Sequence, residues 1–223
     1  ALIHVGNMLV LAHEPTKACR MALEVVTLAT SCRNDGLACE GLLLRGTANF
    51  DAFVVGLRQG KMLQDGPLSA VNVLGDAQEA VEFAQNKLAH QSYESVALLF
   101  LADVLIAFAG MSAVCGESGE FNREEVLSAA SDATTKAHVV YKDLKDEKGV
   151  AGALCAHAEI TAMLDDTVGA VELIKQVMQL AVRDFAHFVE RGAWSEIVPK
   201  PGFEVIFKRA SAVWERNSGR QSS

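Results

Sequence analysis

The sequence predicts an all-α fold made of stacked helical hairpins, and three observations lead to this prediction. First, Ala, Leu and Val dominate a chain of 223 residues that is only 6% aromatic and contains four prolines. Small and straight-chain residues lose little rotamer freedom in a helix. Second, a pattern of large and small residues recurs along the chain. Third, turn-forming residues follow that pattern, so the elements come in pairs.

The recurring pattern is (Gly/Ala)-Leu-x-x-x-(Gly/Ala), with leucines 40, 56 and 56 residues apart. It places a large residue four positions before a small one on one helical face. The small residue lets a neighbouring helix approach closely. We expect each copy to lie in the first helix of a unit. The copies are Ala1-Leu2…Gly6, Gly41-Leu42…Gly46, Ala97-Leu98…Ala102 and Ala153-Leu154…Ala158.

In the first and last units a turn and a second helix follow. An alanine comes twelve residues after the small residue, and the segments between contain the turns "HEPTK" and "LDDTV". Pro15 suits a first helical turn, and Asp166 and Thr167 are suitable N-caps. Each unit is therefore predicted to be an αα-hairpin. The small residues paired in this way are Gly6 with Ala18 and Ala158 with Ala170.

The two middle units are about 16 residues longer, which is the difference between periods of 56 and 40. The candidate insertions are "DAFVVGLRQGKMLQDGP" and "GMSAVCGESGEFNRE", both glycine-containing and both predicted to lie between the two helices. Insertions at one end of a stacked array would line one edge. The second helices then resume with small residues, which are Ala77, Ala80, Ala84, Ala129, Ala130, Ala133 and Ala137.

Two segments resemble a known family. "VGNMLVLAHEPTKACRMALEVV" resembles a tetratricopeptide repeat (TPR), and "DEKGVAGALCAHAEITAMLDDTVGAVELIKQVMQLA" resembles its longer-period variety. The resemblance covers roughly residues 1–185, but the period differs and the usual aromatic residue of the first helix is absent. It implies a right-handed α-α superhelix that binds proteins, with another α-helical solenoid or bundle as the alternative. The residues that carry it are Gly6, Asn7, Leu9, Ala18, Ala22, Val25, Leu154, Ala158, Ala170, Ile174 and Val177.

We expect the array to occupy residues 1–192, in units of roughly 1–33, 34–90, 91–144 and 145–190. Two prolines in "SEIVPKPGF" then interrupt the helix, and residues 193–216 form a linker and an amphipathic helix. Such a helix would cap the last apolar face of a solenoid, or, alternatively, dock into a partner's groove. Residues 217–223 form a polar tail. The apolar face of the capping helix holds Phe203, Ile206, Phe207, Ala210, Val213 and Trp214.

Charge and cysteine usage narrow the function classes. A formal charge of −8 argues against general binding to nucleic acid or to an anionic membrane. Five cysteines without a CxxC pair indicate small buried thiols in a reducing compartment. We therefore expect an intracellular protein, cytoplasmic in the first instance, with an organelle as the alternative. Asp103 interrupts the most apolar run, "SVALLFLADVLIAFAGMSAV", which predicts a buried helix and no direct membrane insertion.

No motif for catalysis, metal or cofactor binding is present in the sequence. None of the six histidines belongs to an HExxH pair, and there is no GxSxG and no Walker-type loop. "GESGEFN" places Glu where a phosphate would bind, and Asp165-Asp166 reads as a turn and cap. We predict no enzymatic activity, no metal and no cofactor. A catalytic site assembled from residues distant in the sequence remains the alternative.

The TPR resemblance also implies a groove lined by the first helices. A carboxylate clamp, which needs Lys, Arg and Asn, is disfavoured because only Asn7 fits and three groove positions are acidic. An apolar strip with acidic positions suits a basic amphipathic helix or an apolar segment. Alternatively, Asp103 and Glu159 merely bond to adjacent helices. The predicted groove residues are Asn7, Glu40, Leu43, Thr47, Leu99, Asp103, Cys155 and Glu159.

The function expected from these features is that of a non-catalytic protein–protein interaction scaffold, a subunit or domain of a larger assembly. The first residues favour membership of a larger protein or assembly, because they provide no N-terminal cap over the apolar face of the first helix. One alternative is a transient adaptor that binds a short basic or apolar helical motif in an acidic groove. An α-helical enzyme or small-molecule binder is a third class, which would require a deep polar pocket.

Overall fold

The computed structural model describes residues 1–12, 14–58, 70–88, 90–115 and 122–180, and the regular structure of these residues is entirely helical. The prediction of an all-α fold is therefore confirmed for this part of the chain. It contains eight α-helices and one π-helical segment, η1, which continues α4. The elements are α1 (Leu2–Leu11), α2 (Pro15–Ser31), α3 (Asp35–Arg58), α4 (Ala70–Phe83), η1 (Ala84–Leu88), α5 (Gln91–Cys115), α6 (Arg123–Asp143), α7 (Glu147–Met163) and α8 (Thr167–Gln179).

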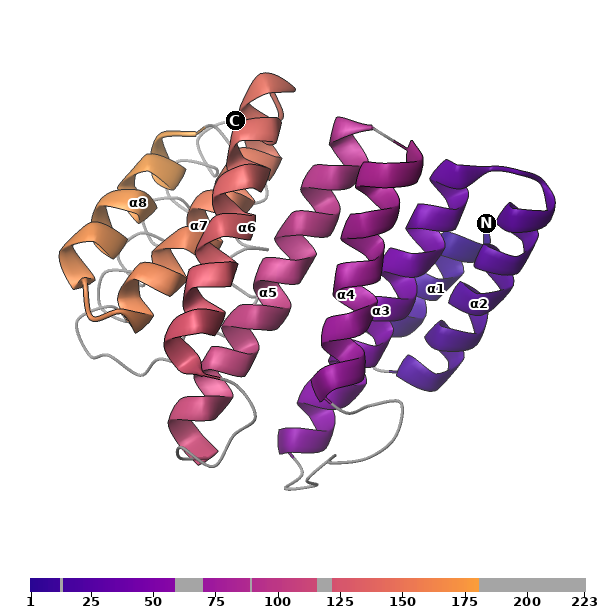
Figure 1. The fold of residues 1–223 in the computed structure, drawn as a ribbon, viewed down its shortest axis with the longest axis horizontal. Helices are drawn as coiled ribbons and strands as arrows, with labels where there is room; N and C mark the ends of the chain where they lie inside the picture. Colours follow the sequence, from indigo (N-terminus) through magenta and orange to yellow (C-terminus); the bar gives the residue numbers. More distant parts are fainter. Residues whose placement is uncertain (13, 59–69, 89, 116–121, 181–223) are drawn as a thin grey trace, which may run out of the picture. The chain divides into compact units, whose positions relative to one another are not determined.

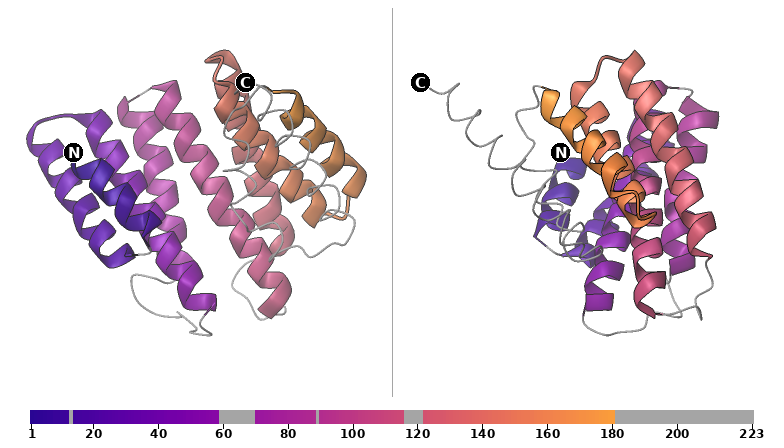
Figure 2. Two further views of the ribbon diagram at one scale, coloured as in Figure 1. Left: turned by 180° about the vertical axis from the view of Figure 1, so that it is seen from behind. Right: turned by 90° about the vertical axis from the view of Figure 1, so that its left-hand side faces the viewer.

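The helices form two compact units that divide within α5. Unit 1 comprises Ala1–Val104, and unit 2 begins at Leu105. In unit 1, α2 packs against both α1 and α3, and α3 packs against α4 (Figure 1). In unit 2, α7 packs against both α6 and α8 (Figure 2). Each unit is thus built from antiparallel helical hairpins laid against one another.

The small residues of the recurring pattern lie where helices approach closely. Gly6, Gly46, Ala102 and Ala158 are all buried. A Cβ atom at Gly6 would overlap the side chain of Leu44, and one at Gly46 would lie 2.7 Å from Cε1 of Phe100. Real Cβ atoms do not make such contacts, so a larger residue at either position would force the side chain of Leu44 or Phe100 to move. This is the close approach that the pattern predicts.

The second helix of each hairpin shares three buried positions with i, i+4, i+7 spacing. These second helices are α2, α4 with its continuation η1, α6 and α8. All twelve side chains at these positions are at most 8% exposed, so the four second helices bury the same face in the same register. Ala80 and Ala133 are buried beside them, whereas Ala129 is exposed and lies outside this face. The shared positions are Ala18, Ala22 and Val25; Ala77, Val81 and Ala84; Ala130, Thr134 and Ala137; and Ala170, Ile174 and Val177.

The two predicted insertions are partly helical, which corrects the expectation that they lie between the first and second helices. Helix α3 continues to Arg58 and helix α5 to Cys115, so both insertions begin as extensions of a first helix. Phe53 and Gly56 are buried in the α3 extension. Apolar packing therefore maintains the helix despite the glycine content of the segment. Residues 59–69 and 116–121, which complete the insertions, lie outside the described residues.

Three of the turns between helices share one backbone conformation. Arg33, Lys145 and Asp165 have positive φ angles of 54°, 57° and 68°. In each turn the next residue donates its N–H to the carbonyl five residues earlier, at 2.9, 2.9 and 3.1 Å. This is the Schellman arrangement that ends a helix.

The residue that closes each of these turns also caps the next helix. Side-chain oxygens of Asn34, Asp146 and Asp166 accept hydrogen bonds from backbone N–H groups three residues later, at 3.0, 3.0 and 2.8 Å. The predicted cap Asp166 is confirmed, and Thr167 is the first residue of α8. Pro15 lies in the first turn of α2, as predicted. The shared turn lets one helix end and the next begin within three residues.

Replacing Lys145 with glycine should raise the free energy of unfolding by about 0.5–1 kcal/mol, because glycine adopts a positive φ without steric cost. Lys136→Gly is the matched control, since Lys136 is exposed in the interior of α6 and glycine there should cost about 1 kcal/mol. Urea denaturation followed by circular dichroism measures both changes. Equal destabilisation by the two variants would contradict the left-handed conformation at Lys145.

Helix α5 is the most apolar long helix of the described chain. Over Gln91–Gly110 it is long and apolar enough to cross a membrane, and 67% of its most apolar window is buried within the structure. A core helix of a soluble protein meets the same criteria of length and composition. The final part of the predicted array, from residue 181, the predicted capping segment 193–216 and the tail 217–223 lie outside the described residues.

Candidate functional site

A cluster of polar side chains joins three helices of unit 1. We call Cys19, Arg45, Asn49, Asp76 and Glu79 the Arg45 cluster; they come from α2, α3 and α4. Nη2 of Arg45 lies 2.9 Å from Oδ1 of Asp76 and 2.5 Å from Oε2 of Glu79. Asn49 donates from Nδ2 to Oδ2 of Asp76 at 2.6 Å, and the Cys19 thiol lies 2.9 Å from Oδ1 of Asn49. A continuous chain of interactions therefore runs from α2 through α3 to α4.

The electrostatics of the Arg45 cluster favour a structural role. Burial lowers the pKa of Arg45, but hydrogen bonds to Glu79 and Asp76 and their charges outweigh it, so the pKa is raised overall. Burial, followed by the charge of Asp76, raises the pKa of Cys19, although Arg45 opposes this. At neutral pH the thiol is therefore protonated, and the single cation faces two carboxylates. The cluster offers neither a thiolate nucleophile nor an unneutralised cation for an anionic ligand.

Sequence reasoning missed this cluster. Its only local signal is a pair of polar residues on α3, Arg45 and Asn49, four positions apart in the segment "LLLRGTANF". Their partners are 26 to 34 residues away in the sequence. Only the packing of α2 and α4 on α3 brings them together.

Six of the eight predicted groove residues lie in unit 1. Asn7 is exposed on α1. Glu40, Leu43 and Thr47 have i, i+3, i+7 spacing on α3 and therefore share one face. The other two, Leu99 and Asp103, share a face of α5, and all five residues on α3 and α5 are half-buried.

Two of the polar groove residues are already engaged within unit 1. Oε1 of Glu40 accepts a hydrogen bond from the Tyr93 hydroxyl at 3.0 Å. The hydroxyl of Thr47 donates to the carbonyl of Leu43 in the same helix at 2.8 Å. Burial, followed by the hydrogen bond and charge of Glu40, raises the pKa of Tyr93, so the phenol remains a donor at neutral pH. One carboxylate oxygen of Glu40 is therefore already engaged within unit 1.

Helix α5 packs against α3 at this face. The rings of Phe50 and Phe100 meet edge to face, with centroids 6.4 Å apart and an interplanar angle of 79°. Phe100 also covers Gly46. The contacts hold the stripe of Glu40, Leu43 and Thr47 beside the N-terminal half of α5.

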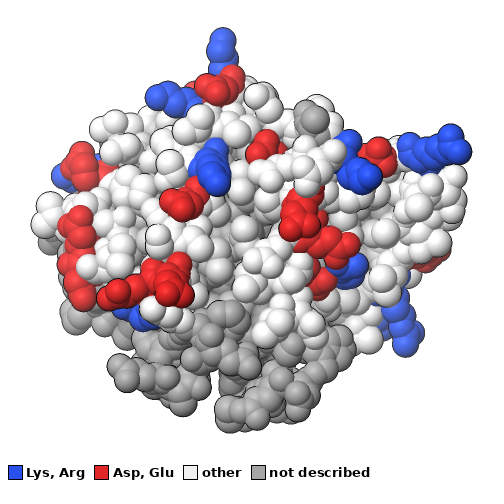
Figure 3. Space-filling model, in the orientation of Figure 1, with Lys and Arg blue, Asp and Glu red and all other residues white. Residues whose placement is uncertain are grey.

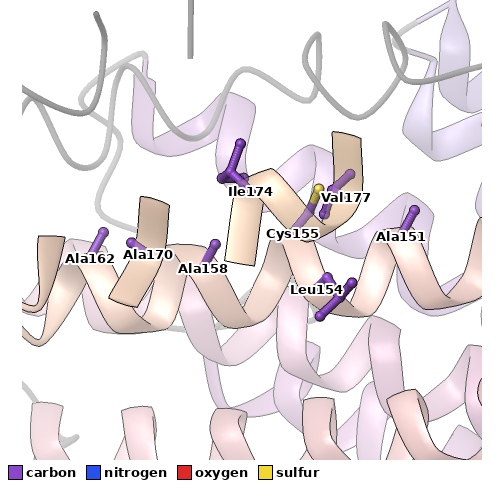
Figure 4. Close-up of a cluster of buried hydrophobic side chains, with 8 residues drawn as sticks. All are labelled: Ala151, Leu154, Cys155, Ala158, Ala162, Ala170, Ile174 and Val177. Atoms are coloured by element: carbon purple, nitrogen blue, oxygen red, sulfur yellow. The ribbon is translucent and has the colours of Figure 1, made fainter. Parts of the chain in front are cut away.

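The two groove residues predicted in unit 2 are inside the protein. Cys155 and Glu159 are 6% and 7% exposed. Cys155 belongs to the hydrophobic core between α7 and α8 (Figure 4), because α8 covers the face of α7 on which it lies. The structure thus corrects the expectation that these two residues line an open groove. The core cluster consists of Ala151, Leu154, Cys155, Ala158, Ala162, Ala170, Ile174 and Val177.

The remaining chemically active side chains do not gather into a site. Among the described residues, no group of three His, Cys, Asp or Glu side chains could hold a metal ion. Cys19, Cys32 and Cys39 are free thiols. Burial, followed by the charge of Glu40, raises the pKa of Cys39 to about 11, so this thiol is inert at neutral pH.

Figure 3 shows Lys and Arg side chains scattered over one face of the surface, whereas Asp and Glu side chains gather in places. Lys and Arg side chains lie among Asp and Glu side chains, with a larger uncharged area around them. Nucleic-acid binding would require Lys and Arg to gather in a patch. On this face the described residues show no such patch.

No protein-family model matches the chain, and a search of curated proteins finds no match. The TPR resemblance of the sequence stays a prediction.

Acidification below about pH 6.5 should destabilise the protein through His138 and His157. Burial lowers the pKa of both, and the charges of Lys142 and His157 lower that of His138 further. The folded protein therefore binds these protons less readily than the unfolded chain does. The free energy of unfolding then falls as the pH drops through the unfolded-state pKa.

Urea midpoints at pH 7.5, 6.5 and 5.5 measure this effect. His157→Gln should reduce the loss of stability between pH 7.5 and pH 5.5, whereas His4→Gln, at an exposed position, should leave it unchanged. An identical pH dependence in His157→Gln and the unmodified chain would contradict the assignment.

Proposed function

We propose that this chain is an α-helical repeat domain of the TPR-like, right-handed superhelical type, and that it binds another protein without catalysing a reaction. One observation supports this most strongly, namely the regular recurrence of structural positions along the chain. Helices α3, α5 and α7 begin at Asp35, Gln91 and Glu147, 56 residues apart. The second helices bury the same three positions in four consecutive pairs.

Recurrence of this kind is typical of helical arrays, in which each hairpin packs on its neighbours. Arrays expose long surfaces of similar side chains, which suit extended protein partners better than small molecules. The Arg45 cluster, which links α2, α3 and α4, bonds mainly within itself, with Nε of Arg45 as the exception, and it presents neither a thiolate nor an unneutralised cation. Protein binding is the function that this combination supports best.

A stable subunit of a larger assembly is the first form of this proposal. Several large apolar side chains are exposed among the described residues, which favours contact with another protein. The most exposed of them are Leu11 in unit 1 and Val168 in unit 2.

A transient adaptor is the second form of this proposal, and the predicted groove residues on α3 and α5 favour it. Leu43 and Leu99 are half-buried apolar groups, and Asp103 adds a carboxylate to the face of α5. An apolar strip with an acidic end would accept a basic amphipathic helix. In this form the partner is held partly by charge, so its affinity depends on salt.

Affinity capture of the full-length protein, washed at about 0.1 M and then about 0.5 M salt, tests both forms. Partners that survive high salt indicate a large apolar interface and a stable subunit. Partners lost at high salt indicate the adaptor. Failure to capture a protein under either condition would contradict the proposed function.

A further inference from the structure

One of the three junctions between hairpins differs from the other two. Asn34, His90 and Asp146 each precede a first helix and are 56 residues apart. The side chains of Asn34 and Asp146 accept the backbone N–H three residues later. At His90 the corresponding N–H, that of Tyr93, bonds to the backbone carbonyl of His90 at 3.1 Å. Helix α5 therefore begins on a backbone hydrogen bond where α3 and α7 begin on a side-chain cap.

The helix before this junction also ends differently. Helices α2 and α6 are α-helical to Ser31 and Asp143, whereas α4 ends in the π-helical segment η1 (Ala84–Leu88). A π-helical turn is rare, and it often lies at a functional position. Its return to α-helical geometry would change the direction in which the residues after it face. Both the end of one helix and the start of the next are thus altered at this junction.

Side-chain contacts hold the junction together. Nε2 of Gln85 in η1 donates to Oε1 of Glu94 in α5 at 2.8 Å, but this bond is exposed and water competes for both groups. The Tyr93 hydroxyl donates to Oε1 of Glu40 in α3 at 3.0 Å in a part-buried position. The rings of Tyr93 and His90 meet edge to face, with centroids 5.6 Å apart. The bond from Tyr93 to Glu40 is therefore the contact that fastens the first turn of α5 to α3.

We propose that the junction between α4 and α5 is a hinge that regulates the predicted groove. In the closed state the Tyr93 hydroxyl occupies one carboxylate oxygen of Glu40 and holds the first turn of α5 on α3. In the open state that turn leaves α3, and Glu40 accepts a Lys or Arg of a basic partner helix instead. Such a charge-assisted bond is stronger than one from a neutral phenol, so a basic partner shifts the hinge towards the open state. This inference rests on the proposed function, in its adaptor form, and adds how the groove is regulated.

Amide exchange of the full chain, followed by mass spectrometry, tests the hinge without a partner. After correction for intrinsic rates, residues 91–95 should exchange at least about tenfold faster than the equivalent residues 35–39 and 147–151. His90→Asn installs the cap that Asn34 provides and should slow exchange over residues 91–95 by about fivefold. Equal protection at the three junctions, or no slowing in His90→Asn, would overturn the proposal.

Tyr93→Phe tests the bond to Glu40, because it removes the hydroxyl and keeps a ring beside His90. It should speed exchange over residues 91–95 by about fivefold and leave residues 147–151 unchanged. Thr27→Val is the matched control, since the Thr27 hydroxyl bonds within α2, to the carbonyl of Leu23. Exchange over residues 91–95 that is the same in Tyr93→Phe and Thr27→Val would overturn the proposal.

A labelled amphipathic peptide of leucine and lysine tests the regulation of the groove by fluorescence anisotropy. Tyr93→Phe should bind it about fivefold more tightly than the unmodified chain, because more of the protein is already in the open state. Glu40→Gln should bind it more weakly. Equal affinity of Tyr93→Phe and the unmodified chain, or no binding by either, would overturn the proposal. The exchange and peptide measurements need no natural partner, so their failure is distinct from a failure of affinity capture, which concerns the proposed function.

Discussion

Replacing Gly41 with alanine should lower the free energy of unfolding by about 2 kcal/mol, although alanine is the better helix former. The new Cβ atom would lie 2.7 Å from Cγ2 of Val26, 3.1 Å from Cγ1 of Val25 and 3.2 Å from the backbone nitrogen of Val26. Val25 is buried, and a backbone nitrogen within a helix cannot move away from the contact. Helices α2 and α3 must therefore separate, with loss of packing along their whole contact.

Gly75→Ala is the matched control, because a Cβ atom there would have nothing within 4 Å. Gly75 is exposed in α4, so alanine should raise the free energy of unfolding by up to about 1 kcal/mol through helix propensity alone. Urea denaturation of the two variants gives opposite signs if the packing is as described. Stabilisation by Gly41→Ala would show that α2 and α3 are not in close contact at this glycine.

The hairpins could be predicted because residue size carries the information. Gly6 and Gly46 lie in closely packed helices, and a small residue four positions after a leucine is a local pattern that a single sequence displays. The buried faces of the second helices follow from the same spacing of small residues. Fold class and helix pairing therefore follow from the order of large and small residues, together with composition and the turn-forming residues between helices.

Helix ends were harder to predict. The insertion that begins at Asp51 was expected to lie between two helices, yet α3 continues to Arg58 with Phe53 buried. The turns at Arg33 and Lys145 carry no glycine, so their left-handed conformation gives no signal in the sequence. In the extension of α3, tertiary packing overrides local helix propensity. In the turns at Arg33 and Lys145, backbone hydrogen bonding overrides the local preference against a positive φ.

At the candidate sites, contacts between helices were also difficult to predict from the sequence. The predicted groove assumed that one face of each first helix is open, but α8 covers Cys155 on α7. Conversely, Asp76 comes close to Arg45 only when α4 packs on α3, and neither residue shows this in the sequence. Positions within one helix can be predicted from spacing, whereas contacts between helices depend on crossing geometry that the spacing leaves undetermined.

Removing the carboxylate of Asp76 is the other substitution with a large expected effect. Asp76→Ala should lower the free energy of unfolding by about 2–3 kcal/mol, because it leaves a half-buried guanidinium with one partner and Asn49 without its acceptor. The side chains of Arg45 and Asp76 are only 19% and 16% exposed, whereas Glu79, the remaining partner, is 55% exposed. Solvent screening makes Glu79 a weak replacement.

A double-mutant cycle separates the ion pair from the loss of packing. Arg45→Met with Asp76→Ala should cost less than the sum of the single changes, by about 1 kcal/mol or more, because neither charge is then left alone. Glu172→Ala is the control: its pair with Lys175 spans 3.0 Å with both side chains about 60% exposed, so its loss should change the free energy by less than about 0.5 kcal/mol. If Asp76→Ala matches this control, the Arg45 cluster is screened by solvent and does not hold α2, α3 and α4 together. A strong coupling would instead show that the ion pair between Arg45 and Asp76 stabilises the packing of α4 on α3.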